Sequence, residues 1–250
     1  MGIVTLTTDF GSGSPYVAQM KGVLLSASRD LVLVDIAHNL PPYAIADAEL
    51  LLRSTAFAFP LGSVHIVVVD PGVGSERRGI AVEANGCFFV GPDNGVLGAV
   101  ASCGSCVSLD KTFLHRTPSA STFHGRDIFA PVAAELALGL TLLDVGSLIA
   151  DPVKSTLPVF AETDTAVRGL TLGADRYGNL LTNIPARFVA AQVSVGGISV
   201  SLVRTYAEAA VGALVALVGS DGYLEIACRE ASAAERLGAV RGTEVVCHCA

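Results

Sequence analysis

Four side chains that could move a proton or hold a charged ligand follow strand-like or loop-like stretches of this 250-residue sequence. Asp9 ends the run IVTLTT, and Asp70 ends the run VHIVVV. Glycine-rich segments follow both, and they let the backbone approach a ligand closely. Arg77 lies in DPGVGSERRG and His124 in TFHGRD, before an apolar helix-like stretch. Asp70, Arg77 and His124 would supply a carboxylate, a fixed cation and an imidazole, a set suited to handling a proton.

These residues also have purely structural interpretations. Aspartate often forms turns or caps helices, and Asp70 could simply pair with Arg77 or with the adjacent Arg78. Because Asp9 and Asp70 end what we expect to be neighbouring strands, a shared site is favoured over two independent caps. Adjacent side chains of an extended segment point to opposite sides, so only one of the two arginines is expected to enter that site.

A metal site and a phosphate-binding loop are both disfavoured. Asp9, Asp70, Asp93 and His124 could bind a divalent ion, but no HxH, HExxH or DxD spacing occurs. The segments GSGSPY and GVGSERRG match neither the dinucleotide fingerprint nor a P-loop. The cysteines of CGSC and CHC, Cys103, Cys106, Cys247 and Cys249, could form a zinc site. Reduced thiols are favoured instead.

The composition narrows the class of partner. Sixteen Lys and Arg against 23 Asp and Glu give a net charge of −7, which argues against nucleic acid and favours a small or cationic ligand. No run approaches 18 apolar residues, so no membrane partner is expected. Nothing resembling a signal peptide precedes the first strand-like run, and this favours a cytoplasmic protein.

Strand-like and helix-like runs alternate through residues 2–70, which predicts a βαβαβ order and a mostly parallel sheet covered on both faces. EANGCFF, residues 83–89, predicts a hairpin with an Asn-Gly turn. The proline-containing segment 151–163 has no clear period, whereas short β-rich runs follow it. We therefore expect an α/β domain over residues 1–155 and a small barrel or sandwich over residues 163–250.

Seven segments, in order from about Ile3 to Gly238, closely resemble the SAM hydroxide adenosyltransferases, relatives of the SAM-dependent fluorinase and chlorinase. They are TTDFGSGSPYVAQMKG, DIAHNLPPYAIADAELLL, VVVDPGVGSERRGIAVE, FVGPDNGVL, STFHGRDIFAP, ADRYGNLLTNIP and GSDGYLEIA. The resemblance implies a Rossmann-like N-terminal α/β domain, a smaller C-terminal β-barrel, and a homotrimer with active sites between subunits.

The implied reaction is hydrolysis of S-adenosyl-L-methionine to adenosine and methionine, by attack of water or hydroxide at the ribose C5′. The leaving group is a neutral thioether expelled from a sulfonium, so neither a general acid nor a cofactor is required at that end. Water is a weak nucleophile at pH 7, and the enzyme must align and activate it. Asp70, Arg77 and His124 match the water-binding triad of the family, and which of them is the base stays open.

The resemblance also implies substrate contacts. Asp9 matches the residue that accepts hydrogen bonds from the ribose hydroxyls. Asp175 and Asn179 match residues near the methionine amino group and the adenine, and Ser220 matches a contact to the methionine carboxylate. The relatives place aromatic residues around the adenine and ribose at the positions of Tyr43, Tyr177 and Tyr206, although each could equally be a packing residue.

Three positions depart from the family pattern. Ser14 replaces a frequently acidic residue near the ribose, and Cys228 and Arg229 lie where the backbone of the relatives passes the adenine. Halogenase-like sequences lack the Asp and the His of the triad, so halogenation is disfavoured here. A module that binds SAM or adenosine with little turnover remains the alternative to the hydrolase.

Overall fold

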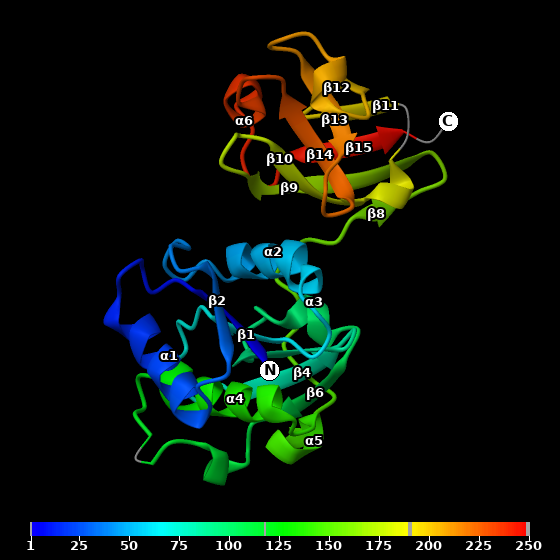
Figure 1. The fold of residues 1–250 in the computed structure, drawn as a ribbon. Helices are drawn as coiled ribbons and strands as arrows, with labels where there is room; N and C mark the ends of the chain where they lie inside the picture. Colours follow the sequence, from blue (N-terminus) through cyan, green and yellow to red (C-terminus); the bar gives the residue numbers. More distant parts are fainter. Residues whose placement is uncertain (1, 118, 190–191, 249–250) are drawn as a thin grey trace. The chain divides into compact units, whose positions relative to one another are not determined.

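The computed structural model describes residues 2–117, 119–189 and 192–248. Packing divides the chain into two units, Met1–Thr156 and Leu157–Ala250 (Figure 1).

In the described part of the first unit, seven strands form one sheet in the order β2-β1-β3-β5-β4-β6-β7. The strands are β1 (Ile3–Thr8), β2 (Val32–Ala37), β3 (Val64–Val68), β4 (Gly79–Ala84), β5 (Cys87–Pro92), β6 (Ser105–Ser108) and β7 (Ser147–Leu148). The β2-β1-β3-β5 half is parallel, and the remaining pairs are antiparallel. The parallel half is the part that the alternating sequence predicted, and the α/β class is confirmed.

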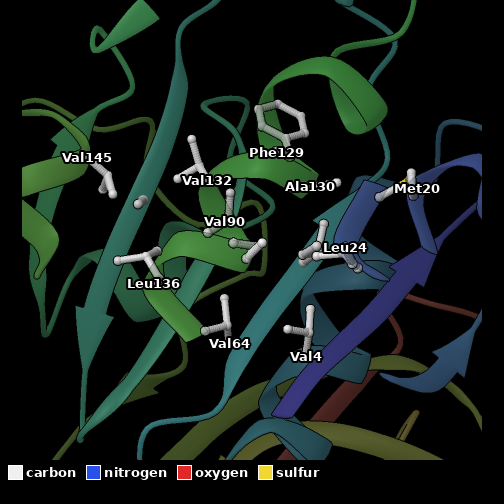
Figure 2. Packing of buried hydrophobic residues seen from close by; sticks show 14 of the residues in the cluster. Val4, Met20, Leu24, Val64, Val90, Phe129, Ala130, Val132, Leu136 and Val145 are labelled. Atoms are coloured by element: carbon white, nitrogen blue, oxygen red, sulfur yellow. The ribbon is translucent and has the colours of Figure 1, made fainter. Parts of the chain in front are cut away.

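Helices cover both faces of this sheet. They are α1 (Pro15–Ala27), α2 (Ile45–Thr55), α3 (Gly98–Ala101), α4 (Ala130–Leu138) and α5 (Leu142–Val145), with short turns η1 (Ala56–Ala58), η2 (Thr112–Leu114) and the π-helical turn η3 (Gly125–Phe129). Met20 and Leu24 of α1 and Leu136 of α4 belong to one core cluster with Val4 and Val64 of the sheet (Figure 2). Residues of α2 and α3 form a second cluster against the opposite face. Burial on both faces explains why the central strands are almost continuously apolar.

The predicted Asn-Gly hairpin joins β4 to β5, which pair antiparallel with Ala84 opposite Cys87. Asn85 and Gly86 have φ of 50° and 76°. Two successive positive φ values are what a two-residue hairpin turn of the favoured hand requires, so the local prediction is confirmed.

One imidazole is buried at the centre of the sheet. His65 of β3 is 1% exposed, and its Nδ1 lies 2.8 Å from Thr5 Oγ1 on the adjacent β1. Its ring stacks on Phe89 with 5.1 Å between centroids. Desolvation by burial lowers the pKa of His65 to about 4, because the charged form would have to leave water.

We expect this histidine to make the fold acid-sensitive. As the pH falls, the unfolded chain binds a proton near pH 6.5, while the folded chain does so only near pH 4. Stability present above pH 6.5 is therefore lost progressively between pH 6.5 and 4, by on the order of 3 kcal/mol. Urea unfolding at pH 7.5 and pH 4.5 measures this loss. The same pH dependence in His65→Phe would contradict the assignment.

In the second unit, seven described strands close into a barrel in the order β10-β14-β13-β12-β11-β15-β9, with β9 returning to β10 and β8 added to β9. The elements are β8 (Ala161–Glu162), β9 (Ala166–Ala174), β10 (Leu180–Pro185), η4 (Ala186–Phe188), β11 (Gln192–Val195), β12 (Ile198–Leu202), η5 (Tyr206–Glu208), β13 (Leu214–Val218), β14 (Tyr223–Cys228), α6 (Ala233–Leu237) and β15 (Glu244–His248). A β-barrel, one of the two architectures predicted for this region, is confirmed.

β12 pairs with β13 in parallel. The pairs on either side of it in the described barrel, β11 with β12 and β13 with β14, are antiparallel. Parallel strands cannot be joined by a tight hairpin, so residues 203–213 form a longer connection that carries η5. We call residues 203–213 the crossover segment.

Candidate active site

The two strand-end aspartates lie at the same edge of the first unit's sheet. β1 and β3 are adjacent and parallel, with Thr8 opposite Val68. Asp9 follows β1 directly, and Asp70 lies two residues beyond β3. The expectation that they leave neighbouring strands is confirmed, and this is the edge at which open α/β sheets bind ligands.

Asp70, Arg77 and His124 are in direct contact. Arg77 Nη2 donates to Asp70 Oδ2 at 2.5 Å and to His124 Nδ1 at 2.9 Å. Its Nη1 donates to the carbonyl oxygen of Arg78 at 2.9 Å, which fixes the plane of the guanidinium. The ring of Phe129 lies below, 5.6 Å from the Arg77 guanidinium carbon to the ring centroid. The structure thus brings together three residues of which the first and last are 54 positions apart in the sequence.

A close backbone approach brings the loop after Asp70 to the segment before His124. Gly74 has φ +80°, and a Cβ placed on it would lie 2.5 Å from the carbonyl oxygen of Ser121. An L-residue would be strained there both by its φ and by this contact. A glycine at position 74, the second glycine of DPGVG, is therefore needed for the two loops to approach this closely.

Aromatic packing joins the loop of Asp9 to the same segment, which the sequence alone did not suggest. Phe10 contacts Phe123 edge-on, with 6.0 Å between ring centroids, and Tyr16 contacts both rings at 5.7 and 5.2 Å. Phe10 adjoins Asp9, and Phe123 adjoins His124. Edge-to-face pairs of this kind stabilise a fixed relative position of the two loops.

The two adjacent arginines have different partners. Arg78 Nη2 lies 2.7 Å from Asp93 Oδ2, and its Nη1 lies 2.9 Å from Asp151 Oδ1. Arg77 alone of this pair contacts Asp70. The opposite orientations expected of neighbouring side chains are therefore observed. Asp93, considered above as a metal ligand, forms an ion pair with Arg78.

Burial shifts the pKa values of the triad residues. The side chains of Asp70 and Arg77 are 5% and 8% exposed. Desolvation raises the pKa of Asp70, and the charge of Arg77 opposes this rise. Desolvation, followed by the charge of Arg77, lowers the pKa of His124. His124 is therefore a neutral imidazole at pH 7.

The hydrogen bonds assign a tautomer to His124. A guanidinium only donates, so Nδ1 of His124 must accept from Arg77, and the ring proton resides on Nε2. Within the described residues, the buried Oδ1 of Asp70 has no hydrogen-bond partner, although the Gly72 amide is near enough to lower the pKa of the carboxyl. The triad therefore presents an unused acceptor on Asp70.

Asp9 is held from the segment after β2. The Tyr43 amide donates to Asp9 Oδ2 at 2.9 Å, and Tyr43 has φ 67° with 71% of the residue exposed. Packing in a core is thus not the role of Tyr43. Ser14, which departs from the family pattern, is the N-cap of α1 and accepts from the Tyr16 amide at 3.3 Å.

The other five predicted substrate residues line one pocket of about 600 Å³ in the barrel unit. These are Asp175, Tyr177, Asn179, Tyr206 and Ser220. The same pocket is also lined by Glu225, Cys228, Arg229, Glu230, Ala231 and Ser232. Sequence reasoning missed Glu225, because an acidic residue within an alternating strand is usually a solvated one.

Asp175 organises one wall of this pocket. Its Oδ1 accepts from the amides of Tyr177 and Asn179 at 2.8 and 2.9 Å, and its Oδ2 accepts from Asn179 Nδ2 at 3.0 Å. Tyr177 and Tyr206 are 78% and 43% exposed, so neither is a core packing residue. Tyr206 Oη donates to Glu225 Oε1 at 2.6 Å.

Two family models match the chain, one in each unit. The N-terminal domain of the SAM hydroxide adenosyltransferases matches residues 4–146, and the C-terminal domain of the same family matches residues 171–246. The chain belongs to the SAM hydroxide adenosyltransferase family.

Curated relatives of this family member match nearly the whole chain. A protein of Thermus thermophilus named (R)-S-adenosyl-L-methionine hydrolase is 38% identical over 97% of this chain and 98% of its own. One of Salinispora arenicola with the same name is 34% identical over 97% and 96%. A fluorinase of Actinopolyspora mzabensis is more distant, at 26% identity over 93% and 92%.

The fold of this family member is shared with a solved structure. An uncharacterized conserved protein from Thermotoga maritima superposes with a TM-score of 0.90 at 32% identity, over 99% of this chain and 100% of that one.

Two further observations concern metals and membranes. Among residues 2–117, 119–189 and 192–248, no group of three or more His, Cys, Asp or Glu side chains could hold a metal ion. Cys249 of the CHC segment lies outside the described residues, and Cys103 and Cys106 are free thiols. In the part of the chain that is described, no helix has both the length and the apolarity to cross a membrane.

Proposed function

We propose that this protein hydrolyses S-adenosyl-L-methionine to adenosine and L-methionine, with water held by Asp70, Arg77 and His124. The observation that carries the proposal is the buried Oδ1 of Asp70 beside the Arg77 guanidinium, which accepts no hydrogen bond from any residue that the structure describes. An orphaned acceptor in a site with little solvent access is costly unless a ligand fills it. The names of the relatives, (R)-S-adenosyl-L-methionine hydrolase, support the same substrate.

The reaction balances without a cofactor. The water oxygen forms a bond to the ribose C5′, the C5′–S bond breaks, and its electron pair neutralises the sulfonium as the thioether of methionine. The water loses one proton. Since sulfur leaves as a neutral atom, only the nucleophile needs activation.

Asp70 is the base in this scheme. The Nδ1 lone pair of His124 is engaged by Arg77, and its Nε2 carries a proton, so neither nitrogen is free to accept another. Oδ1 of Asp70 accepts the water proton. Arg77 supplies the fixed positive charge that favours hydroxide over water, and His124 holds Arg77 and donates from Nε2.

The remaining predicted residues bind the substrate. Asp9 accepts hydrogen bonds from the ribose hydroxyls. The residues of the barrel pocket recognise the methionine and adenine ends: Asp175, Asn179 and Ser220 make polar contacts, and Tyr177 and Tyr206 provide aromatic ones. Tyr43 provides an aromatic contact beside Asp9. The homotrimeric state and the cytoplasmic location stay predictions from the sequence.

We expect purified protein incubated with SAM in ¹⁸O-water to release methionine and adenosine labelled in the 5′-hydroxyl. The two sulfonium epimers are assayed separately, because the relatives are named for the (R) form. Release of S-adenosylhomocysteine, or SAM retained without turnover, would contradict hydrolysis, and the second outcome would identify a binding module. A chlorinated nucleoside formed in chloride would indicate a halogenase, and activity lost on chelation would indicate a metal-dependent hydrolase.

A further inference from the structure

The crossover segment covers one outer side of β13 and β14. Val203 and Ala209 of this segment pack on the buried Val215, Leu217 and Ala227 of these strands. By the alternation of a strand, Ala227 and Glu225 of β14 share a face, whereas Leu224 and Ile226 belong to the barrel core. Glu225 therefore lies on the side of β14 that the crossover segment covers.

Arg229, which had no explanation in the sequence, holds the backbone of the crossover segment. Its Nη1 donates to the carbonyl oxygens of Ala209 at 2.6 Å and Ala207 at 3.4 Å. Its own backbone exchanges hydrogen bonds with Gly212 and Ala213, at 2.8 and 3.1 Å. Together these contacts attach the segment to the end of β14 from Ala207 to Ala213.

Glu225 is hydrogen-bonded to Tyr206, a side chain of the crossover segment. It is 8% exposed and accepts the hydrogen bond from Tyr206 Oη at 2.6 Å. Burial, followed by the charges of Asp175 and Asp221, raises the pKa of Glu225, and the hydrogen bond from Tyr206 opposes this rise. A carboxylate is costly to bury in this setting, and the hydrogen bond from Tyr206 offsets part of that cost, so the ring and the carboxylate hold each other in place.

We propose that Glu225 is a positioning residue for the adenosyl ligand: it fixes the Tyr206 ring as a wall of the barrel pocket, while Arg229 fixes the backbone on which that ring is mounted. The inference rests on the proposed function, since it assigns the ligand of the pocket. Neither residue need touch the reacting atoms. Loss of Glu225 therefore weakens ligand binding and leaves the chemical step intact.

A spectroscopic test needs no turnover. The chain has five tyrosines and no tryptophan, so incorporation of 3-fluorotyrosine gives a simple ¹⁹F NMR spectrum, in which Tyr206→Phe identifies the Tyr206 resonance. We expect Glu225→Gln to move this resonance more than the others, and adenosine to move it in the unmodified protein. A Tyr206 resonance unaffected by Glu225→Gln would overturn the proposal.

Binding and kinetics supply the second test. We expect Glu225→Gln and Tyr206→Phe each to raise the KM for SAM and the Kd for adenosine about tenfold, with kcat changed less than about threefold. The double variant is expected to be no weaker than either single variant, since both remove one interaction. If the increases in KM and Kd of the two single variants multiplied in the double variant, or if only kcat fell, the proposal would be overturned.

Glu244→Gln is the matched control, because Glu244 loses the same charge in the same barrel and pairs with the exposed Arg168. It is expected to leave KM and the Tyr206 resonance unchanged. Arg229→Gln is expected to broaden or move the Tyr206 resonance in folded protein. Failure of the proposed function is seen separately, as absence of hydrolysis by the unmodified protein.

Discussion

Replacement of Asp70 by asparagine is expected to lower kcat for SAM hydrolysis by about 10²–10⁴-fold, with little change in the Kd for adenosine. The amide keeps the shape of the side chain but cannot take a proton from water. Its oxygen can still accept from Arg77, so the loop is expected to stay in place. Single-turnover kinetics with a parallel binding measurement separate the two effects.

The pH profile provides a second measurement of the same role. Burial raises the pKa of Asp70, so we expect kcat to fall as the pH decreases through that raised value and the carboxyl becomes protonated. Asp93→Asn is the matched control, because Asp93 is also a buried aspartate paired with an arginine. Equal losses of kcat in the two variants would mean that Asp70 acts only through stability.

Arg77→Lys is expected to lower kcat at least about 100-fold, even though the charge is kept. One ammonium cannot replace the planar group that reaches Asp70, His124 and the Arg78 carbonyl together. Once Arg77 is replaced, Nδ1 of His124 is no longer held as an acceptor, and the assigned tautomer is lost. Steady-state kinetics on folded protein measure the effect.

Arg78→Lys makes the same substitution one residue along the chain. Arg78 joins Asp93 and Asp151 instead of the triad, so kcat is expected to stay within a few-fold of the unmodified protein. A larger loss in Arg78→Lys than in Arg77→Lys would reverse the roles that we assign to the two arginines.

Local patterns predicted the elements of the fold because each acts over a few residues. The apolar runs before Asp9 and Asp70 predicted buried strands, and Asn85-Gly86 predicted a hairpin, since one turn geometry suits that pair. The side chain alternation of an extended segment also predicted that the two arginines separate, but not which one meets Asp70. That choice depends on contacts with Phe129 and His124, which are distant in sequence.

The family resemblance led to the pocket residues, whereas the support around them could not be predicted. Nothing in the strand pattern around Glu225 indicates that the crossover segment covers it. Arg229 is an unexplained charge until its guanidinium meets the carbonyl oxygens of Ala207 and Ala209. Both signals depend on tertiary contacts, and a pattern with a period of two residues carries no information about them.

The number of strands in the barrel has a consequence of its own. Directions can alternate all the way around a ring only when the number of strands is even, and the described ring has seven. Parity therefore forces at least one parallel neighbour, which in the described strands is β12 beside β13. In this chain the two parallel neighbours are also consecutive in sequence, so they need a long connection. The odd count is met here by the crossover segment, and Tyr206 lies on it.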